Sequence, residues 1–142
     1  MRLLTNISLV CLSAWLVGCG SQAQQVENRQ TAAQSHQEGV ASFSGKDYPA
    51  AQQQLTAAIE AGDLPVDLYV DAHVKRAVAN AVLGDYDQAH ADLDKMEQGA
   101  LDLDVVFAAR SFVLEKEGKQ AASKAAWSEA RRINNQVRRF EE

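Results

Sequence analysis

Five glycines divide most of the chain into segments of similar length. From Thr31 onward they recur fifteen to twenty-two residues apart, and the segments between them are rich in Ala and Gln: Gly45, Gly62, Gly84, Gly99 and Gly118. Glycine commonly ends helices, and segments of this length suit helices of three to four turns. The spacing predicts an all-α fold with six helices, over residues 32–44, 48–61, 66–83, 86–98, 103–117 and 120–139.

Residues that favour helix starts support these divisions. Pro49 and Pro65 each fall in a predicted first turn, where the missing N–H costs nothing. Asp85 is a suitable N-cap with Gln88 three residues further on, and Asp102 is in place to cap the fifth helix.

Length and composition exclude several classes of protein. A chain of 142 residues has room for one domain. Only 6% of its residues are aromatic, and two prolines and eight glycines are too few for a β-sandwich rich in turns. The net charge of −5 argues against a general nucleic-acid binder, which needs a dense basic face. No nucleic-acid partner is therefore expected.

The first residues have the pattern of an export signal. Arg2 precedes an apolar run from Ile7 to Val17, which is interrupted only by Ser8 and Ser13. That run is too short for a permanent membrane-spanning helix, which needs about 20 apolar residues. Residues 1–18 are therefore predicted to be a signal peptide that is removed.

The end of this segment, Leu16-Val17-Gly18-Cys19, resembles the lipobox of bacterial lipoproteins. The resemblance implies cleavage before Cys19 and acylation of its side chain, so the lipid membrane is one expected partner. No Asp follows the cysteine, and Gly20-Ser21 in that place implies the periplasmic face of the outer membrane. The alternative is an uncleaved or ordinarily cleaved signal with an incidental cysteine. No cofactor other than this covalent lipid is expected.

Removal of the signal changes the charge distribution. The remaining 124 residues carry a net charge of −6. Cys11 leaves with the signal, so no thiol pair remains for a disulfide. Residues 19–30 are polar without apolar periodicity and are expected to form a flexible lipidated tether, which leaves 31–142 as the folded domain. Residues 60–104 hold eleven acidic and three basic residues, whereas 110–142 hold eight basic and five acidic residues.

The domain contains three related segments: 45–55, 84–93 and 118–127. Aligning them gives three columns of corresponding residues, and a fourth column lies nine residues before the first of these. Within each column the residues are 38 and 34 positions apart. These columns are Tyr48, Tyr86 and Gln120; Ala51, Ala89 and Ser123; Leu55, Leu93 and Trp127; and the small residues Gly39, Ala77 and Ser111.

At these columns the chain resembles the tetratricopeptide repeat (TPR), a helix-turn-helix unit of 34 residues. The resemblance implies a short right-handed solenoid of three stacked antiparallel hairpins. Small residues would let helices approach closely, and Leu55, Leu93 and Trp127 would fill the layers between repeats. The repeat usually has a large aromatic residue early in its first helix. Phe107 fits this pattern in the third copy, but the first two copies have Ser35 and His73 there. The usual closing proline is also absent, at Asp63, Leu101 and Asn135.

In this family the first helix of each repeat lines an inner groove that binds partners. The resemblance assigns twelve residues to that groove: Ala33, His36, Val40 and Phe43; Asp71, Val74, Val78 and Ala81; and Val105, Ala108, Phe112 and Glu115. Such a groove suits a partner helix or an extended segment. The alternative is that these side chains pack on the tether or the last helix.

No motif for catalysis or metal binding is found, and no enzyme is predicted. His36, His73 and His90 lack the spacing of metal ligands and are interpreted as surface or partly buried polar residues. The acids Asp85, Asp87, Asp92, Asp94 and Glu97 lack the loop order of a calcium site and are interpreted as a solvated helix face.

The last predicted helix carries an apolar seam with helical spacing, formed by Ala126, Ala130, Ile133, Val137 and Phe140. Four arginines flank this seam. Either the seam folds back along the array or it meets a partner, and a third interpretation places it on a membrane surface.

The resemblances together imply a lipid-anchored periplasmic adaptor that binds another envelope protein or peptide segment. Pilotins and scaffolds of envelope assembly are lipoproteins of this kind. The alternative is a structural homo-oligomer that pairs through Ile133, Val137 and Phe140.

Overall fold

The structure, a computed structural model, describes residues 20–142, and within this range it contains helices and no strand. The predicted signal peptide and Cys19 lie outside the described residues. As predicted, residues 20–142 form six helices: α1 (Gly20–Ser44), α2 (Tyr48–Ala61), α3 (Val66–Leu83), α4 (Tyr86–Glu97), α5 (Leu103–Lys116) and α6 (Gln120–Ile133).

Two helix ends differ from the sequence prediction. Helix α1 begins at Gly20 rather than at residue 32, so the segment expected to be a flexible tether is helical. Its first fully buried residue is nevertheless Ala32, where the packed part of the helix begins. Helix α6 ends at Ile133 rather than at residue 139, and the residues that follow are not helical. The other predicted ends lie within one residue of the observed ones.

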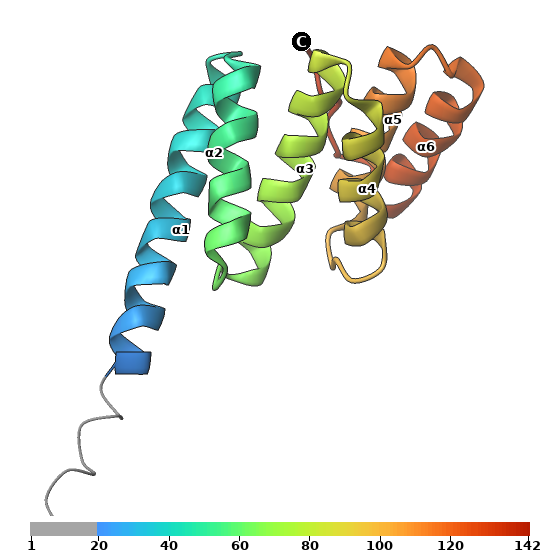
Figure 1. The fold of residues 1–142 in the computed structure, drawn as a ribbon. Helices are drawn as coiled ribbons and strands as arrows, with labels where there is room; N and C mark the ends of the chain where they lie inside the picture. The colour runs from blue at the N-terminus through green and yellow to red at the C-terminus, as the bar shows by residue number, and fades with distance from the viewer. Residues whose placement is uncertain (1–19) are drawn as a thin grey trace, which may run out of the picture.

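The helices form a row of antiparallel hairpins, α1 with α2, α3 with α4 and α5 with α6 (Figure 1). Helix α3 lies in the middle and packs against α1, α2, α4 and α5, whereas α6 packs on α5 alone among the described elements. The contacts of α3 with α1 and α5 place the first helices of the three hairpins in one series. This packing of adjacent helices is consistent with a helical repeat.

The main core lies between α3, α4 and α5. It is built from small and medium apolar side chains, among them Val74, Val78, Leu93, Val106 and Val113. A smaller cluster of Ala51, Leu55 and Ala72 joins α2 to α3. Because alanine and valine make up most of these two clusters, the helices approach closely and bury their apolar faces with few large side chains.

The repeated small residues lie at contacts between helices. A Cβ atom on Gly39 would lie 2.7 Å from Leu55 Cγ, so α1 and α2 touch there with no room for a side chain. In the third hairpin the corresponding contact is polar, because the hydroxyl oxygens of Ser111 and Ser123 lie 3.1 Å apart and share a hydrogen bond. Ala51, Leu55, Ala77, Ala89 and Leu93 are fully buried. Trp127, by contrast, is only half-buried.

The helix starts follow local side-chain chemistry. Asp47 and Asp85 each accept a hydrogen bond from the main-chain N–H three residues ahead, at 3.2 Å. Asp102 is the residue before α5 but makes no such bond, so its predicted capping contact is not present. Gly84 ends α3 with φ of 85°, a conformation that favours glycine. Among residues 20–142, no helix is both long enough and apolar enough to cross a bilayer.

Candidate binding face on helices α1, α3 and α5

The residues that the TPR resemblance assigns to a groove lie on α1, α3 and α5, the helices that contact one another in series. A polar contact joins the first two of these helices, because His36 Nε2 donates to Asp71 Oδ2 at 2.8 Å. Lys75, one turn further along α3, forms an ion pair with the other oxygen of Asp71. We call the surface that these assigned residues of α1, α3 and α5 would form the candidate face.

Several of the predicted groove residues belong to the core instead of to an open groove. Val74 and Val78 are each only 1% exposed and are part of the cluster between α3, α4 and α5. Ala81, Ala108, Phe112 and His36 are also buried. Val40, Phe43 and Val105 are half-buried, and Ala33 and Glu115 are exposed. The α1 and α5 sides of the candidate face are thus more exposed than the middle of α3.

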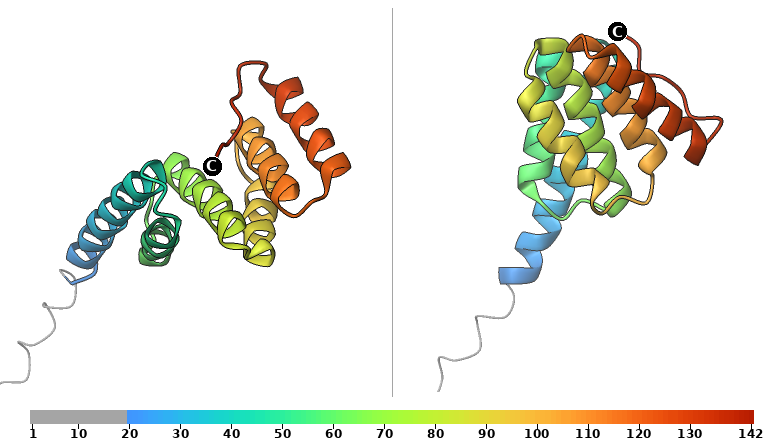
Figure 2. Two further views of the ribbon diagram at one scale, coloured as in Figure 1. Left: turned by 90° about the horizontal axis from the view of Figure 1, so that it is seen from above. Right: turned by 90° about the vertical axis from the view of Figure 1, so that its right-hand side faces the viewer.

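A segment of the chain itself covers part of this face. Residues 134–142, here called the C-terminal strap, leave the end of α6 and run back past α5 toward the end of α3 (Figures 1 and 2). Asn134 has extended backbone angles, φ −140° and ψ 110°, and its side-chain oxygen accepts from the N–H of Gln136 at 3.0 Å. Asparagine favours such local turns over helix, which explains why α6 ends here.

Contacts at both ends hold the strap. At its start, Asn134 Nδ2 donates to Asp104 Oδ2 at 2.7 Å. Near its end, the Phe140 ring meets the Phe43 ring edge to face, with centroids 6.5 Å apart and an interplanar angle of 84°. Phe43 in turn meets Tyr48 at 5.9 Å. These rings link the strap to the first hairpin.

Residues close to Phe140 in the sequence hold the strap through charged contacts. The Arg139 guanidinium lies 4.3 Å from the centre of the Trp127 ring on α6 and 3.6 Å from Glu115 on α5. Lys46, in the turn between α1 and α2, donates to the main-chain oxygen of Glu142 at 2.5 Å. Lys116, at the end of α5, forms an ion pair with the Glu142 carboxylate. Sequence reasoning did not single out Lys46 or Lys116.

The predicted apolar seam on the last helix therefore needs correction. Ala126 and Ala130 are buried on α6, and Ile133 is 42% exposed at its end. Val137 and Phe140 lie on the strap, which is not helical, so the seam does not continue as a helix face. The fold-back interpretation gives the arrangement that the structure shows, with Phe140 packed on the main core. The pair Asn134-Asn135 was the signal for this break.

The strap does not fill the space that it covers. A cavity of about 580 Å³ lies between the strap and the adjoining ends of α5 and α6. It is lined by residues of both helices and of the strap: Phe112, Glu115, Lys116, Gln120, Arg139, Phe140, Glu141 and Glu142.

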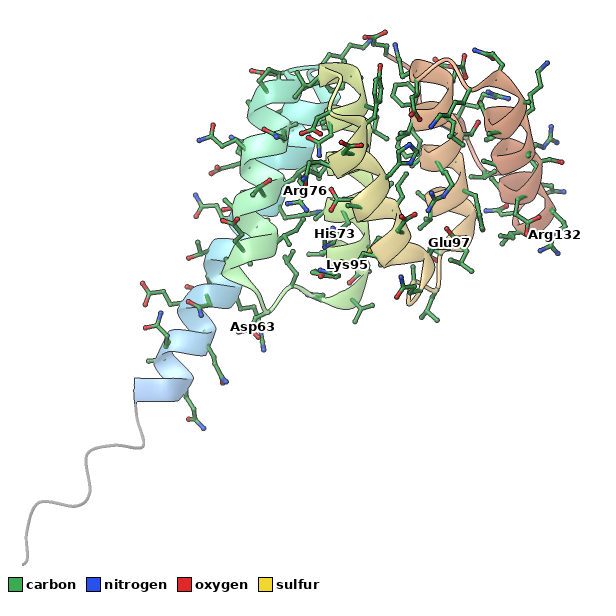
Figure 3. The ribbon with its side chains drawn as sticks, turned by 45° about the vertical axis from the view of Figure 1, so that its right-hand side comes forward. Asp63, His73, Arg76, Lys95, Glu97 and Arg132 are labelled. Atoms are coloured by element: carbon green, nitrogen blue, oxygen red, sulfur yellow. The ribbon has the colours of Figure 1, made fainter. Side chains whose placement is uncertain are left out.

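A buried polar cluster lies between α2, α3 and α4, away from the strap. His73 Nδ1 donates to Asp92 Oδ1 at 2.7 Å, and Arg76 donates to both oxygens of Asp92 at 2.6 and 2.9 Å. Arg76 also donates to the Thr56 hydroxyl at 3.1 Å. Figure 3 shows His73 and Arg76 on α3, on the side that α4 covers. His73 Nε2 is buried without a partner in the described part of the chain.

This cluster corrects the interpretation of the acidic residues as one solvated face. Asp92 is only 5% exposed, whereas Asp85, Asp87, Asp94 and Glu97 are exposed. Burial by itself would raise the pKa of Asp92. The hydrogen bonds from His73 and Arg76 and the positive charge of Arg76 outweigh burial, so the pKa of Asp92 lies below its ordinary value. The carboxylate is ionised and acts as a link between helices.

Within residues 20–142 no group of three His, Cys, Asp or Glu side chains is placed to hold a metal ion. The arrangement offers a face that contacts the chain's own C-terminal strap, with aromatic rings and two lysines at one end. Comparison of the chain with known protein families, with characterised proteins and with solved structures found no match.

Proposed function

We propose that this protein is a non-enzymatic, lipid-anchored adaptor of the bacterial envelope, whose TPR-like array binds an extended segment of another envelope protein on the candidate face. The lipid is carried by Cys19, and the array lies on the periplasmic side of the outer membrane. The lipobox-like Leu16-Val17-Gly18-Cys19 and the preceding apolar run support this location.

Helix packing supports the TPR-like arrangement. The first helices of the three hairpins contact one another in series, α1 with α3 and α3 with α5. Each first helix also packs on the second helix of its own hairpin, with a small residue at the contact: Gly39, Ala77 or Ser111. A stack of such hairpins buries its core between neighbours and leaves one face of the first helices available for a partner.

The observation that carries the proposal is the C-terminal strap. The candidate face already holds an extended segment through a ring contact, a side-chain hydrogen bond and two lysine contacts. These are the kinds of contact by which a groove binds a peptide from another protein. The same observation weakens the alternative of pairing through a C-terminal helix, because Phe140 packs within its own chain.

Crosslinking in living cells tests the adaptor proposal. A photoreactive residue at position 40 or 105 lies half-buried on the candidate face, and one at the exposed position 57 lies on α2 as the control. We expect the same envelope protein to be captured from positions 40 and 105 and not from 57. Equal capture from all three positions would contradict the proposed face. Val74 and Val78 are unsuitable probes, because changing them would disturb the core.

A further inference from the structure

The strap contacts the candidate face at positions that belong to different hairpins. Phe140 packs on Phe43 of the first hairpin, Lys46 of the same hairpin donates to the main-chain oxygen of Glu142, and the Glu142 side-chain carboxylate pairs with Lys116 of the third hairpin. A single aromatic residue with a carboxylate two residues further on thus spans the array from α1 to α5. Two residues of extended chain cover about 7 Å, so this pairing of groups can be met by a short linear segment.

The strap is held loosely enough to be displaced. Val137 and Phe140 are only half-buried, and Glu141 and Glu142 are exposed. Ion pairs in such exposed positions typically contribute about 0–1 kcal/mol each. The cavity of about 580 Å³ beside the strap shows that the segment also leaves contact area unused. A competing peptide could keep the same anchoring contacts and fill that cavity as well.

Without the strap, the surface at this end of the candidate face has a defined chemistry. Phe43, which packs edge to face on the buried Tyr48, offers its ring, and Lys46 and Lys116 offer two positive charges. An aromatic side chain fits the Phe43 ring, a side-chain carboxylate complements Lys116, and a main-chain oxygen accepts from Lys46. A basic or purely aliphatic segment would leave Lys116 or the Phe43 ring without a counterpart.

We propose that the strap is a built-in competitor for the candidate face, and that the partner segment is an extended peptide with an aromatic residue followed two residues later by a carboxylate. The partner segment binds by displacing residues 137–142. This inference rests on the proposed adaptor function and specifies its ligand and its regulation.

A peptide supplied in trans tests the competition. The probe is a fluorescein-labelled peptide with the sequence of residues 134–142, and its binding to the purified full chain is measured by fluorescence anisotropy. In the wild-type chain the tethered strap competes at an effective concentration in the millimolar range. We expect Phe140→Ala combined with Glu142→Lys in the chain to lower the Kd of the labelled peptide at least tenfold. Arg138→Ala is the matched control, because Arg138 is exposed on the strap and makes no hydrogen bond or ion pair there with other described residues; we expect less than a twofold change.

Specificity is tested from both sides. In the released chain, Lys46→Glu with Lys116→Glu should weaken peptide binding at least tenfold. A peptide that lacks the phenylalanine should not bind measurably. Equal binding by the wild-type and released chains, or by the peptides with and without phenylalanine, would overturn the proposal. Circular dichroism checks that the released chain keeps its helices, and Glu142→Lys alone serves as a second variant that removes only an exposed contact.

The outcomes separate this inference from the adaptor function. If positions 40 and 105 still capture an envelope protein while releasing the strap changes neither that capture nor peptide binding, the adaptor stands and the competitor is refuted. If the strap of one chain occupied a second copy, light scattering would show a dimer that the released variant does not form, and the assignment to a single chain would be overturned.

Discussion

At the scale of single residues, Gly39 marks the closest approach of α1 to α2. Its Cβ position lies 2.7 Å from Leu55 Cγ and 3.1 Å from the Leu55 main-chain nitrogen, so any side chain must push the helices apart. We expect Gly39→Val to lower the free energy of unfolding by about 2 kcal/mol, although valine has the better helix propensity. Ala41→Val, on the exposed side of the same helix, is the control and should cost less than about 1 kcal/mol. Urea denaturation measures both, and equal losses would contradict the close contact.

Asp92 links α4 to α3 through His73 and Arg76, and its removal should weaken the fold. Asp92→Asn keeps the shape but leaves the half-buried Arg76 without its counter-charge, so we expect a loss of about 2–3 kcal/mol at pH 7. Asp87→Asn, on the exposed side of α4, should change the free energy of unfolding by less than about 0.5 kcal/mol. Thermal or urea unfolding compares the two.

The pH dependence of Asp92 follows from its lowered pKa. A carboxyl whose pKa is lower in the folded state than its ordinary value of 3.8 stabilises the protein above that value. The stabilisation is lost as the pH falls from about 3.8 through the folded-state pKa. The difference in unfolding midpoint between the wild type and Asp92→Asn should therefore shrink across this acid range. A constant difference down to pH 2 would show that the carboxylate charge is not responsible.

At the scale of helices, the aspartates that precede α4 and α5 are expected to differ in their effect on stability. Asp85 caps α4 by accepting from the N–H of Gln88, whereas Asp102 before α5 accepts no capping bond. Asp85→Ala should cost about 1 kcal/mol of stability, and Asp102→Ala less than about 0.5 kcal/mol. Urea midpoints of the two variants give the comparison. Similar losses would mean that helix-dipole interactions, which both aspartates share, outweigh the specific cap.

The same scale shows how far the sequence predicts the fold. Helices α2 and α3 were located to the residue, because Pro49, Gly62 and Gly84 act locally and need no tertiary information. The start of α1 was predicted wrongly, because the Gln-rich residues 20–31 have no apolar pattern. These residues extend a helix whose packed part begins at Ala32.

The candidate face was predicted only in part for a different reason. The helical spacing of Ile133, Val137 and Phe140 fits an amphipathic helix, and only Asn134-Asn135 indicates that the chain turns back. Val74 and Val78 occupy positions that the family resemblance assigns to a groove, but neighbouring helices bury them. Burial of this kind depends on how closely the hairpins meet, and one sequence does not encode that in any local pattern.

At the scale of the whole molecule, the helices differ in the number of neighbours that protect them. Among the helices of residues 20–142, α3 packs against four others, and α6 packs on α5 alone. We expect native-state hydrogen exchange to be slowest for main-chain N–H groups of α3 and much faster in α6, with the strap fastest of all. Uniform protection from α1 to α6 would indicate a single cooperative unit instead.

The proposed anchor gives a second prediction at this scale. Cys19→Ser removes the only side chain that the lipobox resemblance can acylate, so the protein should move from the membrane to the soluble fraction of cell extracts. Incorporation of labelled palmitate should be lost at the same time. Membrane association that persists without label would contradict the proposed anchor, and Cys11→Ser, within the predicted signal, is the control that should leave both unchanged.

The helical extension of α1 changes what such an anchor would do. Residues 20–31 form a rod about 18 Å long, whereas a flexible chain of the same length has a root-mean-square span of about 19 Å. The average end-to-end distance is nearly the same for the rod and the flexible chain, but this distance varies much more in the flexible chain. A rigid rod keeps the start of the packed array at a nearly constant distance from the proposed lipid. A partner segment that lies at this distance from the proposed anchor would then be favoured over an identical segment that lies nearer to it or farther away.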